Sequence, residues 1–177
     1  MNARLIRTPC LYLVGFMGCG KTTIGSLLAD ELGWNFANLD DDIEAEAHAT
    51  ITSIFEGRGE EAFRQLEHAA LVARVKRVQR GQPMVLSLGG GAFAQEQNVS
   101  LIQENGISIW LDCPLDRIRA RIAGQEHRPL ARDAEKFEAL YHARKSYYAK
   151  ADYRVEVVSD DAQEMVAAIT RVMQPAG

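Results

Sequence analysis

The sequence has few of the features that mark disulfide-rich, membrane or nucleic-acid-binding proteins. Its 177 residues include only three cysteines, Cys10, Cys19 and Cys113, whose odd number and wide spacing fit neither a disulfide framework nor a zinc site. The apolar run at Cys10–Val14 is too short to cross a membrane and lacks the length and cleavage site of a signal peptide. The net charge of −4 gives no basic excess that would favour nucleic acid or a membrane surface. We therefore expect a cytoplasmic protein with reduced thiols and with neither nucleic-acid nor membrane partners.

Internal repeats, low-complexity tracts and linkers rich in proline, glycine or serine are absent from the sequence as well. With 47% hydrophobic and 25% charged residues, the composition is ordinary for a soluble globular protein. The chain is long enough to bury a core without disulfides or metals. Residues 1–177 are thus predicted to form a single domain.

Short apolar runs alternate with longer segments of helical periodicity. Buried strands are predicted at Cys10–Val14, 34–38, 84–88, 107–111 and 153–158. One helix is predicted after the first strand, with Gly33 as its C-cap. A second is predicted over 59–78, and a third has Pro114 in its first turn. A last helix is predicted to be capped by Asp161 and to bury a stripe of Met165, Ile169 and Val172. This alternation predicts an α/β fold with a mostly parallel sheet, which binds ligands at the carboxyl ends of its strands.

The first predicted strand leads into a complete G-x-x-x-x-G-K-[ST] motif, Gly15-Phe16-Met17-Gly18-Cys19-Gly20-Lys21-Thr22. Glycines let such a loop direct several backbone N–H groups at phosphate oxygens, and the following helix adds its N-terminal partial charge. Lys21 would then reach the β- and γ-phosphates, and the Thr22 hydroxyl would ligate Mg²⁺. Cys19 is expected to fill a variable position rather than act as a redox switch. The motif predicts a P-loop that binds ATP through Gly18, Cys19, Gly20, Lys21, Thr22 and Thr23.

Further motifs follow the later strands. The acidic segment Asn38-Leu39-Asp40-Asp41-Asp42-Ile43-Glu44 comes after the second strand, and Arg64 lies on the next helix. The third strand ends in three glycines, Gly89, Gly90 and Gly91, which permit close backbone approach to a ligand. Arg128 lies in a polar stretch where a mobile lid would sit, and Arg144 lies on the helix after it.

In this order and spacing, the motifs resemble the shikimate kinase family over nearly the whole chain. The resemblance implies a P-loop, nucleoside-monophosphate-kinase-like fold: a five-stranded parallel sheet of order 2-3-1-4-5, a substrate-binding segment at about 39–68 and a lid at about 123–133. It also implies transfer of the γ-phosphate of ATP to the 3-hydroxyl of shikimate, in the biosynthesis of chorismate and the aromatic amino acids. The cofactors would be ATP and Mg²⁺, and the enzyme would be a monomer.

The same resemblance implies the roles of the acceptor site. Asp40 would bind the shikimate hydroxyls and serve as base or orienting group. Arg64 and Arg144 would pair with the substrate carboxylate, for which the forked donors of arginine suit a bidentate contact. The backbone of Gly89, Gly90 and Gly91 would lie against the ring.

On the donor side, the resemblance implies that Arg128 moves in with the lid. Together with Lys21 it would neutralise charge on the transferring phosphoryl group. Arg121 matches a position that contacts adenine. The remaining basic residues of this region are expected to be solvated charges: Arg117, Arg119 and Arg132.

Two departures from the family pattern alter these expectations. Asn38 stands where the family has an aspartate that is associated with Mg²⁺ through water, and asparagine accepts a hydrogen bond from such a water without adding charge. The stretch 159–161 lacks the arginine and proline that some relatives place against adenine, so the base is expected to be held there by backbone and apolar contacts. Asp41 and Asp42 are expected to be solvated carboxylates of a helix start.

Two alternatives remain open from the sequence. One is another small-molecule P-loop kinase, such as a gluconate kinase, because two arginines would also suit a sugar acid. The other is a non-catalytic nucleotide or metabolite sensor, which only Asn38 favours.

Overall fold

The five predicted strands form one all-parallel sheet in the computed structural model, which describes residues 9–123 and 133–174. The strands run in the order β2-β3-β1-β4-β5, which confirms the predicted topology. Their bounds are β1 Cys10–Val14, β2 Asn35–Asn38, β3 Met84–Ser87, β4 Ile107–Asp112 and β5 Tyr153–Glu156. Every residue of β1 and β3 is buried, as expected for central strands covered on both faces.

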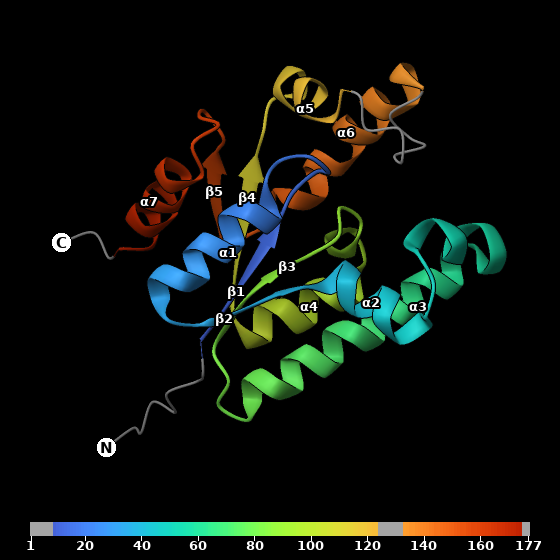
Figure 1. The fold of residues 1–177 in the computed structure, drawn as a ribbon, viewed down its shortest axis with the longest axis horizontal. Helices are drawn as coiled ribbons and strands as arrows, with labels where there is room; N and C mark the ends of the chain where they lie inside the picture. The colour runs from blue at the N-terminus through green and yellow to red at the C-terminus, as the bar shows by residue number, and fades with distance from the viewer. Residues whose placement is uncertain (1–8, 124–132, 175–177) are drawn as a thin grey trace.

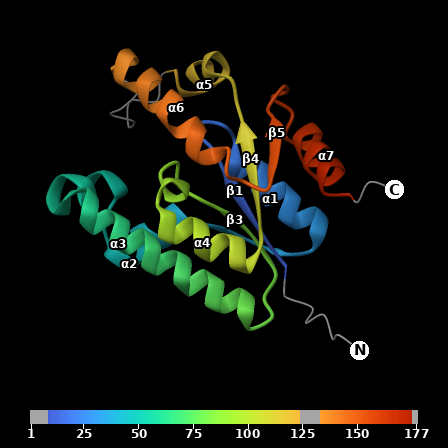
Figure 2. The same ribbon diagram turned by 180° about the vertical axis from the view of Figure 1, so that it is seen from behind.

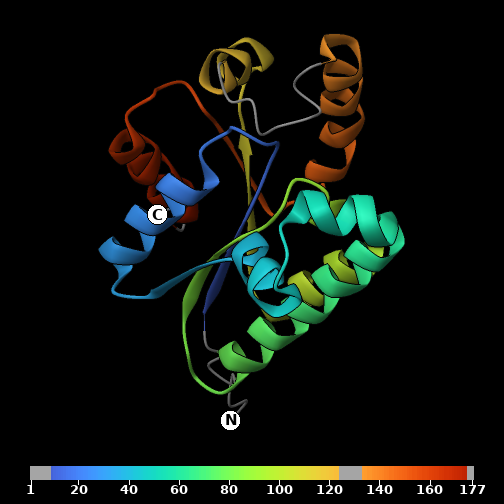
Figure 3. The same cartoon turned by 45° about the vertical axis from the view of Figure 1, so that its right-hand side comes forward.

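The helices cover both faces of this sheet and extend beyond its carboxyl edge. Their bounds are α1 Lys21–Leu32, α2 Leu39–Ala47, α3 Ile51–Gln79, α4 Glu96–Asn105, α5 Leu115–Ile122, α6 Ala134–Tyr148 and α7 Ala162–Met173, with a 3₁₀ turn η1 at Ala92–Ala94. Helices α1 and α7 pack together on one side of the sheet, and α3 packs on α4 on the other (Figure 1; seen from behind in Figure 2). Helices α5 and α6 lie beyond the carboxyl end of β4, above the loop that follows β1 (Figure 3). No helix in the described ranges is both long and apolar enough to cross a membrane.

Two predicted caps are confirmed. Gly33 ends α1 in the left-handed conformation, with φ 67°, which favours glycine. The side chain of Asp161 accepts a hydrogen bond from the backbone N–H of Gln163 and so caps α7.

The helix predicted over 59–78 is present as the second part of α3, and a first part from Ile51, capped by Thr50, meets it at a kink at Gly59, where φ is 82°. Two other local predictions are wrong. Pro114 lies one residue before α5 rather than in its first turn. Val172 is 38% exposed, and Val166 takes its place beside Met165 and Ile169 in the core.

Asp42 is not the solvated carboxylate that the sequence suggested. It accepts two hydrogen bonds from Arg74, at 2.6 and 2.5 Å, and so ties α2 to α3. Asp41 is exposed, as expected. This ion pair holds the acidic segment after β2 against the long helix that carries Arg64.

Candidate active site

The loop between β1 and α1 has the shape of a phosphate cradle. Gly18 and Gly20 adopt φ values of 78° and 99°, which favour glycine, and Gly20 is the N-cap residue of α1. The free N–H groups of the first helical turn therefore point toward the loop. Lys21 Nζ donates to the carbonyl oxygens of Gly15 and Phe16, at 2.8 and 3.0 Å. The lysine charge is thus held over the cradle before any phosphate is bound.

Cys19 is fully buried inside this loop. Its Sγ lies 3.7 Å from Lys21 Nζ, and a side-chain carbon placed on Gly15 would come within 2.9 Å of the same sulfur. The thiol therefore fills the space that the missing side chain of Gly15 leaves, in line with the space-filling role expected for it.

Asn38 connects the cradle to the segment after β2. Its Oδ1 accepts from the backbone N–H of Asp40 at 3.0 Å and caps α2, while its Nδ2 donates to Thr22 Oγ1 at 3.1 Å. The cap fixes the amide so that its nitrogen, and not its oxygen, faces the Thr22 hydroxyl.

Asp40 lies between the cradle and the triple glycine. Its Oδ1 is sealed from solvent and has no hydrogen-bond partner among the described residues. A side-chain carbon on Gly89 would come within 2.7 Å of this oxygen. Burial raises the pKa of the Asp40 carboxyl above its ordinary value, against the lowering effect of Lys21 and Arg64. A buried carboxylate with a free lone pair and a raised pKa is suited to accept a proton from a bound hydroxyl.

Two guanidinium groups converge on the same glycine loop. A side-chain carbon on Gly91 would collide with both Arg64 and Arg144, although the two arginines lie on α3 and α6. Arg144 Nη1 also donates to the carbonyl oxygen of Gly90 at 2.8 Å. The fold therefore brings two forked cations to one side of this loop, opposite Asp40.

Glu67 supports this site, although no sequence motif pointed to it. It is completely buried, and its Oε1 accepts from Arg64 Nη1 at 2.9 Å. Burial raises the pKa of Glu67, and the neighbouring Arg64 opposes this. Glu67 lies three residues after Arg64 and Glu60 four residues before it, and both spacings are common for ion pairs on helix surfaces. Only burial distinguishes Glu67 from Glu60, which is exposed.

Tyr148 is a second residue that sequence reasoning did not select. Its side chain is 1% exposed, and its hydroxyl donates to the carbonyl oxygen of Gly90 at 2.6 Å. Gly90 thus accepts from Tyr148 and from Arg144, both on α6. The acceptor side of the site is therefore attached to the helix that follows the lid segment.

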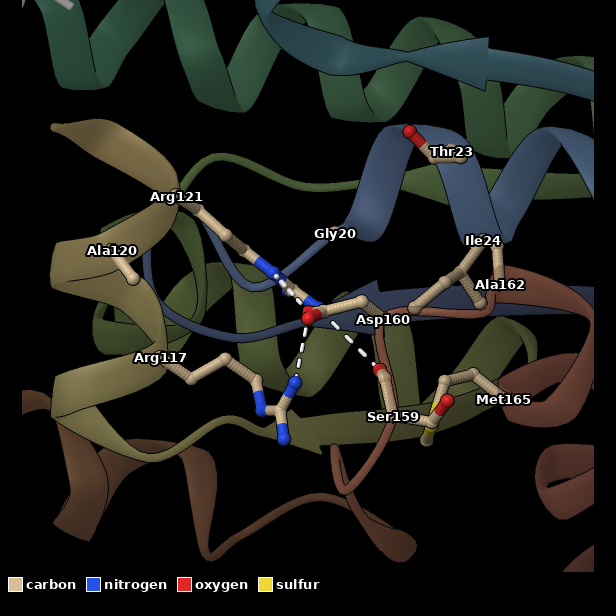
Figure 4. Close-up of a pocket in the computed structure, with 10 residues that line it drawn as sticks. All are labelled: Gly20, Thr23, Ile24, Arg117, Ala120, Arg121, Ser159, Asp160, Ala162 and Met165. Atoms are coloured by element: carbon tan, nitrogen blue, oxygen red, sulfur yellow. Dashed lines mark hydrogen bonds and ion pairs between the residues drawn. The ribbon is translucent and has the colours of Figure 1, made fainter. Parts of the chain in front are cut away.

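A pocket of about 440 Å³ lies on the other side of the cradle. Figure 4 shows the residues that line it: Gly20, Thr23, Ile24, Arg117, Ala120, Arg121, Ser159, Asp160, Ala162 and Met165. Arg121, predicted from the sequence, borders this pocket, and Gly20 and Thr23 join it to the cradle. Its size and its mix of apolar and polar walls are typical of a small-molecule site.

Two of the arginines expected to be solvated charges are partly exposed and form ion pairs at the surface. Arg117 forms an ion pair with Asp160 at 2.8 Å, and Arg119 forms one with Glu138 at 2.8 Å. Near 159–161, Asp160 also pairs with Arg121 at 2.8 Å, so charged side chains lie at this wall of the pocket, and the expectation that the base is held there largely by backbone and apolar contacts stays a prediction. Arg128 and Arg132 lie outside the described residues, as does most of the predicted lid.

Metal ligands are few in the part of the chain that the structure describes, where no cluster of three or more His, Cys, Asp or Glu could hold an ion. Thr22 Oγ1 and the unpaired Oδ1 of Asp40 are the oxygens that face the cradle region. Two protein oxygens suit Mg²⁺, which keeps waters and takes most remaining ligands from phosphates.

Comparison with known proteins identifies relatives along almost the whole chain. A family model described as shikimate kinase matches residues 17–174. The shikimate kinase of Persephonella marina is 40% identical over 157 residues, which cover 88% of this chain and 93% of the relative. That of Cereibacter sphaeroides is 40% identical over 174 residues, covering 97% of this chain and 84% of the relative. A solved structure of a shikimate kinase from Acinetobacter baumannii in complex with shikimate superposes with a TM-score of 0.85 at 34% identity, covering 93% of this chain and 92% of that one.

Proposed function

This chain belongs to the shikimate kinase family, and from that premise we propose how its own residues phosphorylate shikimate. The enzyme transfers the γ-phosphate of ATP to the 3-hydroxyl of shikimate and releases ADP and shikimate 3-phosphate. The reaction belongs to the pathway to chorismate and the aromatic amino acids. The observation that carries the assignment of residues is the convergence of Asp40, Arg64 and Arg144 on the triple glycine beside the phosphate cradle.

Arg64 and Arg144 bind the shikimate carboxylate together, beside Gly91. Both guanidinium groups already point at this glycine, which supports a bidentate contact that needs little rearrangement. Glu67 orients Arg64 through its 2.9 Å hydrogen bond. The backbone of Gly89 to Gly91 lies against the ring; the absence of side chains there lets Asp40 and the two guanidinium groups approach this backbone, since a side-chain carbon on Gly89 or Gly91 would collide with them.

Asp40 holds the reacting hydroxyl and takes its proton as the phosphoryl group is transferred. The unpaired Oδ1 and the raised pKa of this carboxyl support the role of acceptor. Lys21 exchanges its contacts with the loop carbonyls of Gly15 and Phe16 for the phosphate oxygens. Arg128 adds a second positive charge from the lid. Positioning and charge neutralisation supply most of the catalysis of phosphoryl transfer.

The residues present fit a Mg²⁺ ion bound with the nucleotide. Thr22 Oγ1 would ligate it, and waters and phosphate oxygens would supply most remaining ligands. When bound, Mg²⁺ neutralises charge on the β- and γ-phosphates. Asn38 orients the Thr22 hydroxyl through its Nδ2.

The pocket beside Arg121 receives the adenine and ribose of ATP. Its junction with the cradle through Gly20 and Thr23 supports this, because the phosphates must continue from the base into the loop. We further propose a monomer in the cytoplasm. One chain supplies every residue assigned above, and all three cysteines are free thiols, as a reducing compartment favours.

A coupled ADP-release assay with Mg²⁺ and ATP tests these assignments. Shikimate is expected to stimulate ADP release by the wild type, whereas gluconate leaves it at the rate without acceptor. Lys21→Ala and Asp40→Ala are each expected to lower kcat by orders of magnitude while circular dichroism stays unchanged. Near-normal turnover by either variant would contradict the role given to that residue. A stimulation by gluconate equal to that by shikimate would contradict the acceptor assignment.

A further inference from the structure

The turn that follows the triple glycine is held by a buried asparagine. Asn98 lies in the first turn of α4 and is completely buried. Its Nδ2 donates to the carbonyl oxygen of Ala92 at 3.0 Å. Ala92 is the first residue of η1 and directly follows Gly91, the glycine on which both acceptor-site guanidinium groups converge. The amide of Asn98 therefore holds the backbone immediately after the glycine loop.

A histidine of α3, the helix that lies beside α4 (Figure 2), completes this connection. Nδ1 of the half-buried His68 lies 2.7 Å from Asn98 Oδ1. Because the Ala92 carbonyl needs a donor, the amide nitrogen of Asn98 faces it and the amide oxygen faces His68. His68 therefore donates from Nδ1, which carries a hydrogen in one neutral tautomer and in the imidazolium alike. This chain, the His68–Asn98 bridge, runs from α3 through α4 to the turn after the glycine loop.

The bridge begins one helical turn after Arg64. His68 is four residues beyond Arg64 on α3, so the two side chains project from the same face of the helix. Arg64 reaches the loop beside Gly91, and the bridge reaches it at the next residue, Ala92. Helix α3 thus meets the loop at two successive points, one that is assigned to the substrate carboxylate and one that is a fixed hydrogen-bonded support.

The glycine loop needs such a support because its backbone has little intrinsic stiffness. The carbonyl oxygens of Gly89 and Gly91 accept from N–H groups of η1, at 3.1 and 3.2 Å, so these bonds stay within the turn. Gly90 is attached to α6 through its carbonyl oxygen. The His68–Asn98 bridge is the corresponding attachment to α3, the helix that carries the other guanidinium group.

We propose that His68 and Asn98 are positioning residues for the acceptor: the bridge sets the spacing between the glycine loop and α3, and with it the distance from the loop backbone to the Arg64 guanidinium. The inference deepens the proposed function and rests on the binding of shikimate at this loop. Without the bridge the loop can shift relative to α3, and acceptor binding then includes the cost of ordering it. The bridge does not contact the loop after β1, so nucleotide binding does not depend on it.

His68→Phe tests the proposal, and Gln79→Met is its matched control. The first change keeps an aromatic ring and removes the donor of the bridge. Gln79 Nε2 donates to Asn105 Oδ1 at 2.9 Å, and Asn105 Nδ2 donates to the carbonyl oxygen of Leu101 at 2.8 Å. Each change therefore breaks one hydrogen bond from α3 to an asparagine of α4, but Gln79 and Asn105 lie at the far ends of these helices from the glycine loop.

We expect His68→Phe to raise the KM for shikimate, and the Kd for shikimate in titrations without ATP, about five-fold, equivalent to about 1 kcal/mol. The kcat and the KM for ATP are expected to stay at the wild-type values. His68→Gln restores an N–H donor and should recover part of the lost affinity. Gln79→Met should change none of these quantities.

Hydrogen exchange in the peptide that contains residues 89–95, measured without substrates, tests the bridge whatever the acceptor is. Exchange should be faster in His68→Phe than in the wild type and in Gln79→Met, because the turn opens more readily without its support. Equal exchange in all three proteins would overturn the proposal. Faster exchange with an unchanged KM for shikimate would show that the bridge only stabilises the turn, and would refute the positioning role.

The kinetic control separates this role from a general disturbance of the site. A rise in the KM for shikimate that is equal in His68→Phe and Gln79→Met, or that is matched by the KM for ATP, would also refute the proposal. A wild type that does not bind shikimate would refute the proposed acceptor instead, and the exchange rates would still decide whether the bridge holds the loop.

Discussion

Replacing Tyr148 by phenylalanine removes one oxygen atom from the support of the acceptor site. The hydroxyl is buried and donates to the Gly90 carbonyl at 2.6 Å. Burial also raises the pKa of Tyr148, so the hydroxyl stays protonated and remains a donor over the whole neutral range. Its removal should therefore have the same effect at every assay pH between 6 and 9, a range of about 3 units in which an ordinary tyrosine is also largely protonated.

The expected loss of stability follows from what remains at Gly90. An acceptor that is buried without any partner costs about 1–3 kcal/mol, but Gly90 keeps the Arg144 donor at 2.8 Å. The loss should therefore lie near the value for one ordinary hydrogen bond, about 1 kcal/mol. In a chain of this length, that change lowers the Tm by about 2–4 °C.

The larger effect is expected on shikimate binding. Without Tyr148, the Gly90 carbonyl is held by Arg144 alone, and Arg144 is also the residue assigned to the substrate carboxylate. The KM for shikimate should rise about ten-fold, equivalent to about 1.4 kcal/mol, with the KM for ATP unchanged.

Tyr141→Phe is the matched control for this prediction. Tyr141 lies two turns earlier on α6, is also buried, and donates to the carbonyl oxygen of Cys113 at 2.9 Å. Both variants should lose similar stability in thermal melts, but only Tyr148→Phe should weaken shikimate in titrations at saturating ATP. The reasoning is refuted if the KM for shikimate is unchanged in Tyr148→Phe, or if it rises equally in both variants.

Three shorter predictions test other parts of the structure. Gly91→Ala inserts a methyl group into the space of both acceptor-site guanidinium groups, so the KM for shikimate should rise at least about ten-fold while the Tm changes little; a normal KM would contradict the placement of the carboxylate there. Gly25→Ala places a carbon 2.7 Å from the ring of Phe36, and such overpacking should lower the free energy of unfolding by about 1–3 kcal/mol in urea titrations, without a selective change in either KM. Because burial raises the pKa of Asp40, the folded state binds a proton at this carboxyl more tightly than the unfolded chain does. The free energy of unfolding should therefore fall as pH rises through the raised pKa of Asp40. The kcat should increase over the same pH range. Asp40→Asn should therefore raise the Tm at neutral pH while abolishing turnover, and a lower Tm would show that the ionised carboxylate stabilises the fold.

The positions of β1, β3 and β4 could be predicted from the sequence because these strands are short apolar runs that are almost entirely buried, whereas the strand order was implied by the family resemblance. The helices were harder to predict. The segment from Thr50 to Arg58 has only one fully buried residue, Ile54, so its hydrophobic pattern is too weak to show a helix. The prediction for Val172 failed because the apolar spacing of α7 fits two adjacent stripes, and only packing against α1 selects the one with Val166.

The site residues that belong to motifs could be selected from the sequence, since their chemistry and order identify them together. The pairs that support them could not be predicted in this way. Arg121 and Asp160 are 39 residues apart, and nothing in the sequence indicates that these two side chains meet. Tyr148 and Glu67 were missed because what distinguishes them is the burial of their polar groups, and burial cannot be read from a sequence.

The position of β1 in the middle of the sheet has a consequence for how this enzyme can be changed. The loop after β1 carries the phosphates, β3 and β2 lie on one flank with the acceptor groups, and β4 and β5 lie on the other with the base pocket. The two substrate sites therefore meet over the central loop. It follows that exchanging the segment at 39–68 for that of a relative with another acceptor replaces Asp40 and Arg64, keeps Arg144 and the triple glycine, and leaves the residues that line the base pocket unchanged.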